Sequence, residues 1–249
     1  IKHNYPRRKV IVNYKDEIFS ADLIEMVKQK KYRYVLTVID CFTKFAFAIP
    51  LKSKTGTSVT EAFKSIFKTR KPEKLWVDKG REFYNKTVLT FLSQHNVQIY
   101  STESELKAVV IERFNRSLKE LLETELLCQE LIGKRRNWLD ILPSVINTYN
   151  NRIHRTIKMT PTQASNNPGD IHTNEETVLI NEPKYKVDTP VRIYKYKTHF
   201  EKGYTSRWSS EVFKIKKVYF TDPITYELVD ESGENIIGRF YEPEILPTV

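Results

Sequence analysis

The pattern of apolar and polar positions in the first hundred residues predicts a sheet with helices between some of its strands. Segments rich in β-branched and aromatic residues are typical of strands. They cover residues 18–26, 32–40, 44–51, 74–78 and 97–100. Only three residues, Cys41 to Thr43, link the second segment to the third, which indicates a hairpin.

Apolar residues at helical spacing predict the other elements of this region. We expect helices over residues 59–68, 88–95, 107–127 and 138–150, and a short one that opens at Pro161. In the third helix the apolar residues Val110, Phe114, Leu118 and Leu121 repeat at helical spacing and predict a buried stripe. Strands and helices in this order favour a layered α/β domain with a mixed sheet.

The last part of the chain has a different pattern. Short strand-like segments at residues 190–196, 212–220, 225–230 and 235–241 are separated by turn signals such as Ser232-Gly233. This spacing predicts a small β-barrel of SH3 type. We therefore expect a basic N-terminal arm (1–17), an α/β core (18–170), a linker (171–183) and the small barrel (184–249).

The excess of basic residues over acidic residues suggests a negatively charged partner. The chain carries 41 Lys and Arg against 31 Asp and Glu, a formal charge of +10, and 30 of the 41 basic residues precede residue 184. A polyanion such as nucleic acid is the natural partner of such a surface, although a basic protein without such a partner remains open. Two cysteines and five scattered histidines give no zinc-site spacing, and no apolar run is long enough to span a membrane.

Three carboxylates are candidates for a metal site. Asp22 lies inside the first predicted strand, Asp78 ends the fourth, and Glu112 lies early in the third helix. If the first and fourth strands are neighbours, these side chains converge, and their oxygen atoms suit Mg²⁺ or Mn²⁺. From position alone Glu25, Asp40 and Glu82 compete, because they also lie near strand ends.

One face of the third predicted helix carries Glu112 and two basic residues. Glu112, Arg116 and Lys119 are spaced i, i+4 and i+7, so they project from the same side. An anion flanked by cations suits a metal ion held beside phosphates. A solvated face with ordinary ion pairs is the alternative, and the spacing does not exclude it.

Several ordered motifs resemble the core of the D,D-E integrases, which has an RNase H-like fold. They are SADLIEM (20–26), YRYVLTVIDCFTKFAFAIPLKSKTG (32–56), WVDKGREF (76–83), KAVVIERFNRSLKE (107–120) and YNNRIHRTIKMTPTQA (149–164). Within that superfamily the chain looks most like the integrases of Maverick/Polinton transposons. FEKGYTSRWSSEVFKI (200–215) and TYELVDESGENIIGRFYEPEIL (225–246) are similar to the SH3-like domain that follows the core in those proteins.

The resemblance implies roles for individual residues. Asp22, Asp78 and Glu112 match the family's catalytic triad, which holds two Mg²⁺ or Mn²⁺ ions, while Arg116 and Lys119 match positions that contact DNA. Lys107 begins the stretch that matches the flexible loop before the helix, and we count it with the DNA contacts. The expected protein is a DNA integrase that trims 3′ ends and joins them to target DNA.

The resemblance also implies surroundings: double-stranded DNA as partner, a homo-oligomer (dimer or tetramer), a nuclear location and no membrane. Two departures matter. Only 33 residues separate Asp78 from Glu112, fewer than in retroviral enzymes, and the family's N-terminal zinc-binding domain has no counterpart here. A domesticated, non-catalytic DNA- or chromatin-binding protein is the alternative. For two other residues we expect structural roles: Asp40 as a strand-end carboxylate and His154 in a helix-end hydrogen bond.

Overall fold

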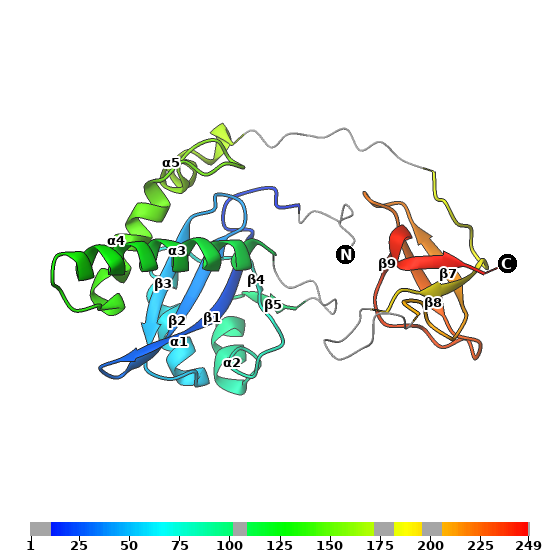
Figure 1. Cartoon of the computed structure of the whole chain (residues 1–249), viewed down its shortest axis with the longest axis horizontal. Coiled ribbons are helices and arrows are strands. Elements are labelled where there is room, and N and C mark those ends of the chain that lie inside the picture. Colours follow the sequence, from blue (N-terminus) through cyan, green and yellow to red (C-terminus); the bar gives the residue numbers. More distant parts are fainter. Residues whose placement is uncertain (1–10, 102–108, 172–181, 196–205, 249) are drawn as a thin grey trace. The chain divides into compact units, whose positions relative to one another are not determined.

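The structure, a computed structural model, describes residues 11–101, 109–171, 182–195 and 206–248 (Figure 1). The chain divides into two compact units, with the change at about residue 174, and each is described here by itself. In the part of the chain that is described, no helix is both long and apolar enough to cross a membrane.

A mixed five-stranded sheet forms the centre of the first unit. Its strands are β1 (Ile18–Gln29), β2 (Tyr32–Asp40), β3 (Ala46–Leu51), β4 (Lys74–Trp76) and β5 (Gln98–Tyr100). They lie in the order β3-β2-β1-β4-β5; β2 is antiparallel to both β3 and β1, whereas β4 is parallel to both β1 and β5. The predicted hairpin of the second and third strands is confirmed, and so is the pairing of the first strand with the fourth.

Helices cover both faces of this sheet. They are α1 (Gly56–Phe67), α2 (Lys86–Gln94), α3 (Val109–Leu131), α4 (Trp138–Asn151) and α5 (Pro161–Asn166), followed by a short 3₁₀ helix, η1 (Pro168–Asp170). Successive side chains of β1 point alternately to the two faces of the sheet, and each face has its own hydrophobic core. Ile18 and Ile24 pack in one cluster with α3 and α4, whereas Phe19 and Ala21 pack in the other with α1 and α2. Asp22 has the parity of Ile24, so its side chain belongs to the α3 face.

The α4 helix fixes α3 against the sheet. The ring of Tyr149 on α4 packs edge-on against Phe114 on α3, with 4.7 Å between the centroids. One residue further, Asn150 forms two hydrogen bonds of 2.9 Å with the backbone of Ala46 at the start of β3. Pro143 lies inside α4, which continues through it as a single helix. The first turn of α3, the end of α4 and the β2–β3 turn are thereby held together.

A buried ion pair closes the base of the sheet. Asp40, at the end of β2, is fully buried and accepts hydrogen bonds from the Phe42 amide and the Thr43 hydroxyl. Its carboxylate pairs with Arg70, whose Nε also donates to Asp16 at 2.7 Å. The structural role expected for Asp40 is confirmed. Residues 12–17, which we had placed in the arm, pack on the core: Val12 and Glu17 are buried.

The second unit contains an antiparallel sheet of five strands in the order β10-β6-β7-β8-β9. The strands are β6 (Pro190–Ile193), β7 (Phe213–Tyr219), β8 (Thr225–Val229), β9 (Phe240–Tyr241) and β10 (Ile245–Pro247), with a 3₁₀ helix, η2 (Glu242–Glu244), before the last. Among the described residues β9 and β10 do not pair, so the sheet is open and a closed SH3-like barrel is not confirmed. β10 lies beyond the predicted strands.

Candidate active site

Strand register brings two of the predicted carboxylates to the same level of the sheet. β1 and β4 are parallel neighbours, and Ser20 pairs with Trp76. Asp22 lies two residues after Ser20, and Asp78 lies two residues after Trp76. Because side chains two residues apart on a strand lie on one face, Asp22 shares the face of Ser20, towards α3. Asp78 lies two residues beyond the end of β4, so the register places its backbone beside β1 but does not fix the direction of its side chain.

Asp78 lies just beyond the end of β4 and is exposed. Its Oδ1 accepts a hydrogen bond of 3.1 Å from the Gly80 amide, which closes a tight turn. Gly80 is not among the described glycines with a positive φ. The glycine is needed for space instead, because a Cβ at this position would lie 2.6 Å from the Glu82 carboxyl carbon and 2.9 Å from Asp78 Oδ1.

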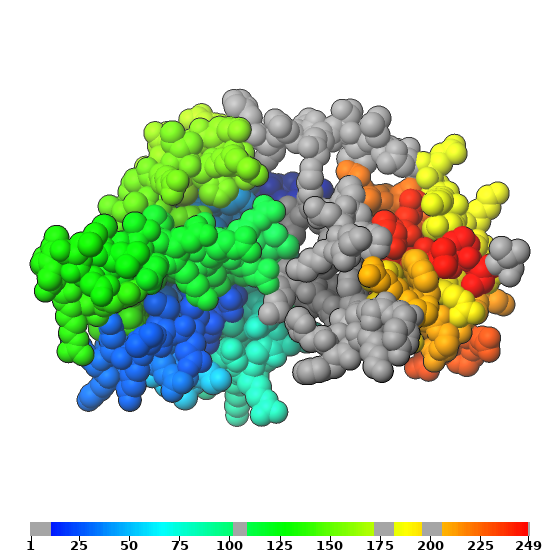
Figure 2. Space-filling model, in the orientation of Figure 1, coloured from blue at the N-terminus to red at the C-terminus, as the bar shows by residue number. Residues whose placement is uncertain are grey.

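The third acid lies on α3, which forms part of the surface of the first unit (Figure 2). Polar side chains of α3, together with Asp22, surround an open depression of about 440 Å³. The lining residues are Asp22, Glu112, Asn115, Arg116, Lys119 and Glu120. The structure thus brings four of the predicted residues together, and Asp78 is not among the lining residues. Lys107 lies outside the described residues.

Sequence reasoning missed one residue of this site, Asn115. Its Nδ2 donates a hydrogen bond of 2.7 Å to Asp22 Oδ2 and so ties α3 to β1. The side chain is buried, and its Oδ1 has no hydrogen-bond partner among the described residues. The available signal was its position three residues after Glu112, on the same side of the helix.

We had placed the buried stripe of α3 on Val110 and Leu121 as well as Phe114 and Leu118. The structure buries Ile111 and Leu122 in their place, together with Asn115, Phe114, Leu118 and Leu126.

The donor set of this site suits a hard divalent cation. Asp22 and Glu112 offer carboxylate oxygens to one depression, and the unpartnered amide oxygen of Asn115 lies beside them. Within the described ranges, however, no three His, Cys, Asp or Glu side chains gather closely enough to hold a metal ion. The convergence of all three carboxylates therefore stays a prediction.

The bond between Asn115 and Asp22 gives a testable prediction. In Asn115→Ala, Asp22 loses the donor that orients its carboxylate. If the chain has the integrase activity that the sequence resemblance implies, DNA joining should fall by about 10–100-fold, the usual effect of losing such a supporting bond, while the melting temperature changes little. Asn147→Ala on the exposed side of α4 serves as the control. Equal joining rates for the two variants would show that the bond has no positioning role.

His154 lies in the loop after α4 and is half-buried. Its amide donates to the Met159 carbonyl at 2.9 Å, and its Nδ1 accepts from the Thr156 amide at 3.3 Å. The hydrogen bond expected at the helix end is not found: both bonds lie within the loop that follows α4. Burial, followed by the nearby charges of Lys44, Arg113 and Arg155, lowers the pKa of His154 from 6.5 to about 4. The imidazole is therefore neutral near pH 7.

This lowered pKa predicts acid sensitivity. Between about pH 4 and pH 6.5 the unfolded chain binds a proton at His154 that the folded chain does not bind, so acid favours unfolding. We expect the free energy of unfolding to fall by about 1–2 kcal/mol from pH 7 to about pH 5, allowing for partial solvent exposure. Urea unfolding of wild type and His154→Gln measures this contribution. The same pH dependence in both proteins would contradict it.

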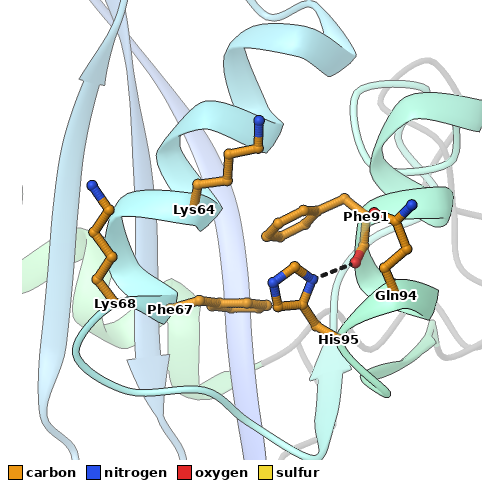
Figure 3. A pocket seen from close by; sticks show the side chains of 6 residues that line it. All are labelled: Lys64, Phe67, Lys68, Phe91, Gln94 and His95. Carbon is orange, nitrogen blue, oxygen red and sulfur yellow. Dashed lines mark hydrogen bonds between the residues drawn. The ribbon is translucent and has the colours of Figure 1, made fainter.

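A second depression, of about 390 Å³, lies between the ends of α1 and α2 (Figure 3). It is lined by Lys64, Phe67, Lys68, Phe91, Gln94 and His95. The His95 and Phe91 rings lie 4.2 Å apart, and His95 Nδ1 donates to the Phe91 carbonyl at 2.8 Å. It offers no carboxylate and belongs to the sheet face opposite α3. It is therefore not the candidate active site.

Comparison with known proteins agrees with this geometry. The family described as "Integrase core domain" matches residues 13–104, which include Asp22 and Asp78 but not Glu112. A transposon-derived protein of Caenorhabditis elegans is 32% identical over 201 residues, which cover 80% of this chain and 67% of that protein. The Pro-Pol polyprotein of simian foamy virus type 1 is 29% identical over 175 residues, 64% of this chain and 14% of the polyprotein.

Solved structures show the same fold. The HTLV-2 integrase catalytic core domain in complex with magnesium (trimeric form) superposes with a TM-score of 0.51 and 19% identity, covering 60% of this chain and 96% of that one. A simian T-cell lymphotropic virus intasome in complex with the PP2A regulatory subunit B56 gamma gives 0.69 at 14% identity, covering 100% and 84%. The first unit has the RNase H-like fold of an integrase catalytic core, and the chain belongs to the integrase core domain family.

Proposed function

We propose that this chain is a DNA integrase of the Maverick/Polinton type, a polynucleotidyl transferase that joins the ends of a mobile element to target DNA. One observation carries the proposal. Asp22, Glu112, Arg116 and Lys119 line one depression, and Asp78 follows the end of β4, the parallel neighbour of the strand that carries Asp22. Acids and cations gathered on one surface are the groups that phosphodiester chemistry requires.

The reaction has two steps. In 3′-end processing, a water oxygen attacks a phosphorus atom near the element end, and the bond from that phosphorus to the 3′ oxygen breaks. In strand transfer, the freed 3′ hydroxyl attacks a phosphodiester of the target, so one such bond forms as another breaks. Because the number of phosphodiester bonds is unchanged in the second step, no energy-rich co-substrate is needed.

Asp22, Asp78 and Glu112 would hold two Mg²⁺ or Mn²⁺ ions. Such ions, when bound, supply charge stabilisation for the attacking and leaving oxygens. The residues of the chain position the DNA. Arg116 and Lys119 lie one and two turns beyond Glu112 on the rim of the depression, where they would contact backbone phosphates, and Lys107 would add a contact from the segment before α3.

The proposed partners are DNA and further copies of the chain, and the proposed location is the nucleus. Double-stranded DNA supplies both the element ends and the target, and the formal charge of +10 suits it. The second unit would act as an SH3-like DNA-binding domain after the core. Pairing of two DNA ends suggests a homo-oligomer, a dimer or tetramer, in the nucleus. The similar solved structure is described as an intasome in complex with a PP2A regulatory subunit.

A joining assay tests this function. Labelled duplexes carrying the element ends are incubated with the purified chain, with Mg²⁺, with Mn²⁺ and with chelator. The proposal expects shortened 3′ ends and joined products only when a divalent cation is present. Products of equal yield in chelator, or none with any end sequence and either ion, would refute it.

A non-catalytic DNA- or chromatin-binding protein is the second candidate. One observation favours it: the described acids do not form a ready metal group. Thermal stability separates the two, because a ligand that binds only the folded state raises the melting temperature. A rise with millimolar Mg²⁺ or Mn²⁺ supports the enzyme, while DNA binding without any such rise supports the binder.

A further inference from the structure

Four basic residues lie on three segments that pack together near the start of α3. They are Lys44, Arg113, His154 and Arg155, called here the basic cluster. Lys44 lies in the β2–β3 turn, Arg113 in α3, and the other two in the loop after α4. Burial, and to a smaller extent the charge of Arg113, lowers the pKa of both Lys44 and His154. None of the four lines the depression around Asp22.

Packing fixes the geometry of this cluster. The Phe114–Tyr149 ring contact sets α3 on α4, and Asn150 clamps the end of α4 to the backbone of Ala46, two residues after Lys44. The loop that follows is closed by two backbone bonds of 2.9 Å, from His154 to Met159 and from Lys158 to His154. The fold thus holds together the segments that carry the four residues.

The positive charge of the cluster is not neutralised by the described residues. Lys44 donates to the Cys41 carbonyl, and burial lowers its pKa. The nearby carboxylate of Asp40 is already paired with Arg70. Arg113 and Arg155 form no ion pair within the described part of the chain. Cations gathered without a counterion are costly, so their arrangement points to an external anion.

We propose that the basic cluster binds one backbone phosphate of a DNA strand, at a site separate from the Arg116 and Lys119 contacts. This inference rests on the proposed function for the identity of the anion. Arg113 can donate two parallel bonds to phosphate oxygens, and Arg155 and Lys44 add charge from the other side. The neutral imidazole of His154 can donate one more bond. The N-terminal end of the 23-residue helix α3 adds its positive dipole.

The position of this site beside Glu112 would let it orient a DNA strand next to the carboxylates. Arg113 directly follows Glu112, and neighbouring helical residues point in different directions. A strand whose phosphate is held by the cluster would therefore pass the first turn of α3 beside the carboxylates. Arg116 and Lys119 lie further along the helix. Two separate phosphate sites along α3 would fix both the position and the direction of the strand.

Single-charge variants of the full chain test the site. Arg113→Gln and Arg155→Gln each remove one cluster cation. Arg135→Gln removes a matched charge beyond the far end of α3, roughly 30 Å away. We expect each cluster variant to weaken binding of a DNA duplex about five- to tenfold at low salt and to reduce the salt slope by about one. The control should change affinity less than about twofold, and its equality with both cluster variants would overturn the site.

A second readout separates failure of the site from failure of the proposed function. The His154 ring signal, followed by NMR, should shift with added inorganic phosphate and with duplex DNA, and Arg113→Gln should abolish both shifts. A phosphate shift in a chain that does not bind DNA would keep the anion site but reject the integrase. DNA binding with an unmoved His154 signal would reject the site and keep the integrase. The absence of both shifts and of DNA binding would reject both.

Discussion

Replacing Asp78 by Asn should lower DNA strand transfer by at least about 1,000-fold, equivalent to about 4 kcal/mol of transition-state stabilisation. The substitution keeps the shape of the side chain but removes the negative charge that a divalent cation requires. The amide oxygen of Asn can still accept the hydrogen bond from Gly80, so the turn should survive. The measurement is the initial rate of joining of preprocessed DNA ends in Mg²⁺ and in Mn²⁺.

Two comparisons make this result specific. Asp170→Asn, which removes the same charge from the exposed helix η1, should leave joining unchanged. The affinity of Asp78→Asn for a DNA duplex should be equal to or slightly greater than that of wild type, because an acid near phosphates is lost. Joining by Asp78→Asn at the wild-type rate would remove this residue from the catalytic set.

Replacing Arg70 by Met should destabilise the first unit by about 3–5 kcal/mol, because it leaves a buried carboxylate without its partner. Asp40 is fully buried, and Arg70 is its ion-pair partner. The same guanidinium also bonds Asp16 and the Ser165 hydroxyl, so one residue joins the segment before β1 to the end of β2 and to α5. Urea unfolding at neutral pH measures the loss.

Two further variants test the cause of that loss. The double variant Arg70→Met/Asp40→Asn should recover part of the stability, because no buried charge is then left alone. Lys64→Met removes the cation of a solvent-exposed pair with Glu61, 2.7 Å apart, and should cost less than about 1 kcal/mol. If Arg70→Met costs no more than Lys64→Met, the buried pair has little part in stability.

Much of the fold could be predicted from the sequence because its elements are strongly patterned. The segment 32–40 became β2 without change, and the helix expected at 138–150 became α4 with one residue more. The three-residue link after Asp40 was enough to predict a hairpin. β10 was missed, because its three residues are too few to show a period. Whether the last sheet closes depends on pairing between distant strands, which local patterns do not encode.

The site was predictable only in part, for a physical reason. Asp22, Glu112, Arg116 and Lys119 could be grouped because strand parity and helical spacing determine which way they point. Asn115 was missed because its role depends on how far α3 is rotated about its own axis. That rotation buries Ile111 and Leu122 rather than Val110 and Leu121. The basic cluster was also out of reach, because two loops and a helix contribute to it.

The short pairing of β1 with β4 has a consequence for which changes in chain length this protein can tolerate. Only three residue pairs align the two strands, and the acids follow two positions after the last pair. Adding or deleting one residue between Trp76 and Asp78 would shift that carboxylate out of register with Asp22. A change of length in this dipeptide should therefore disturb the site more than a change of equal size in a turn far from Asp78.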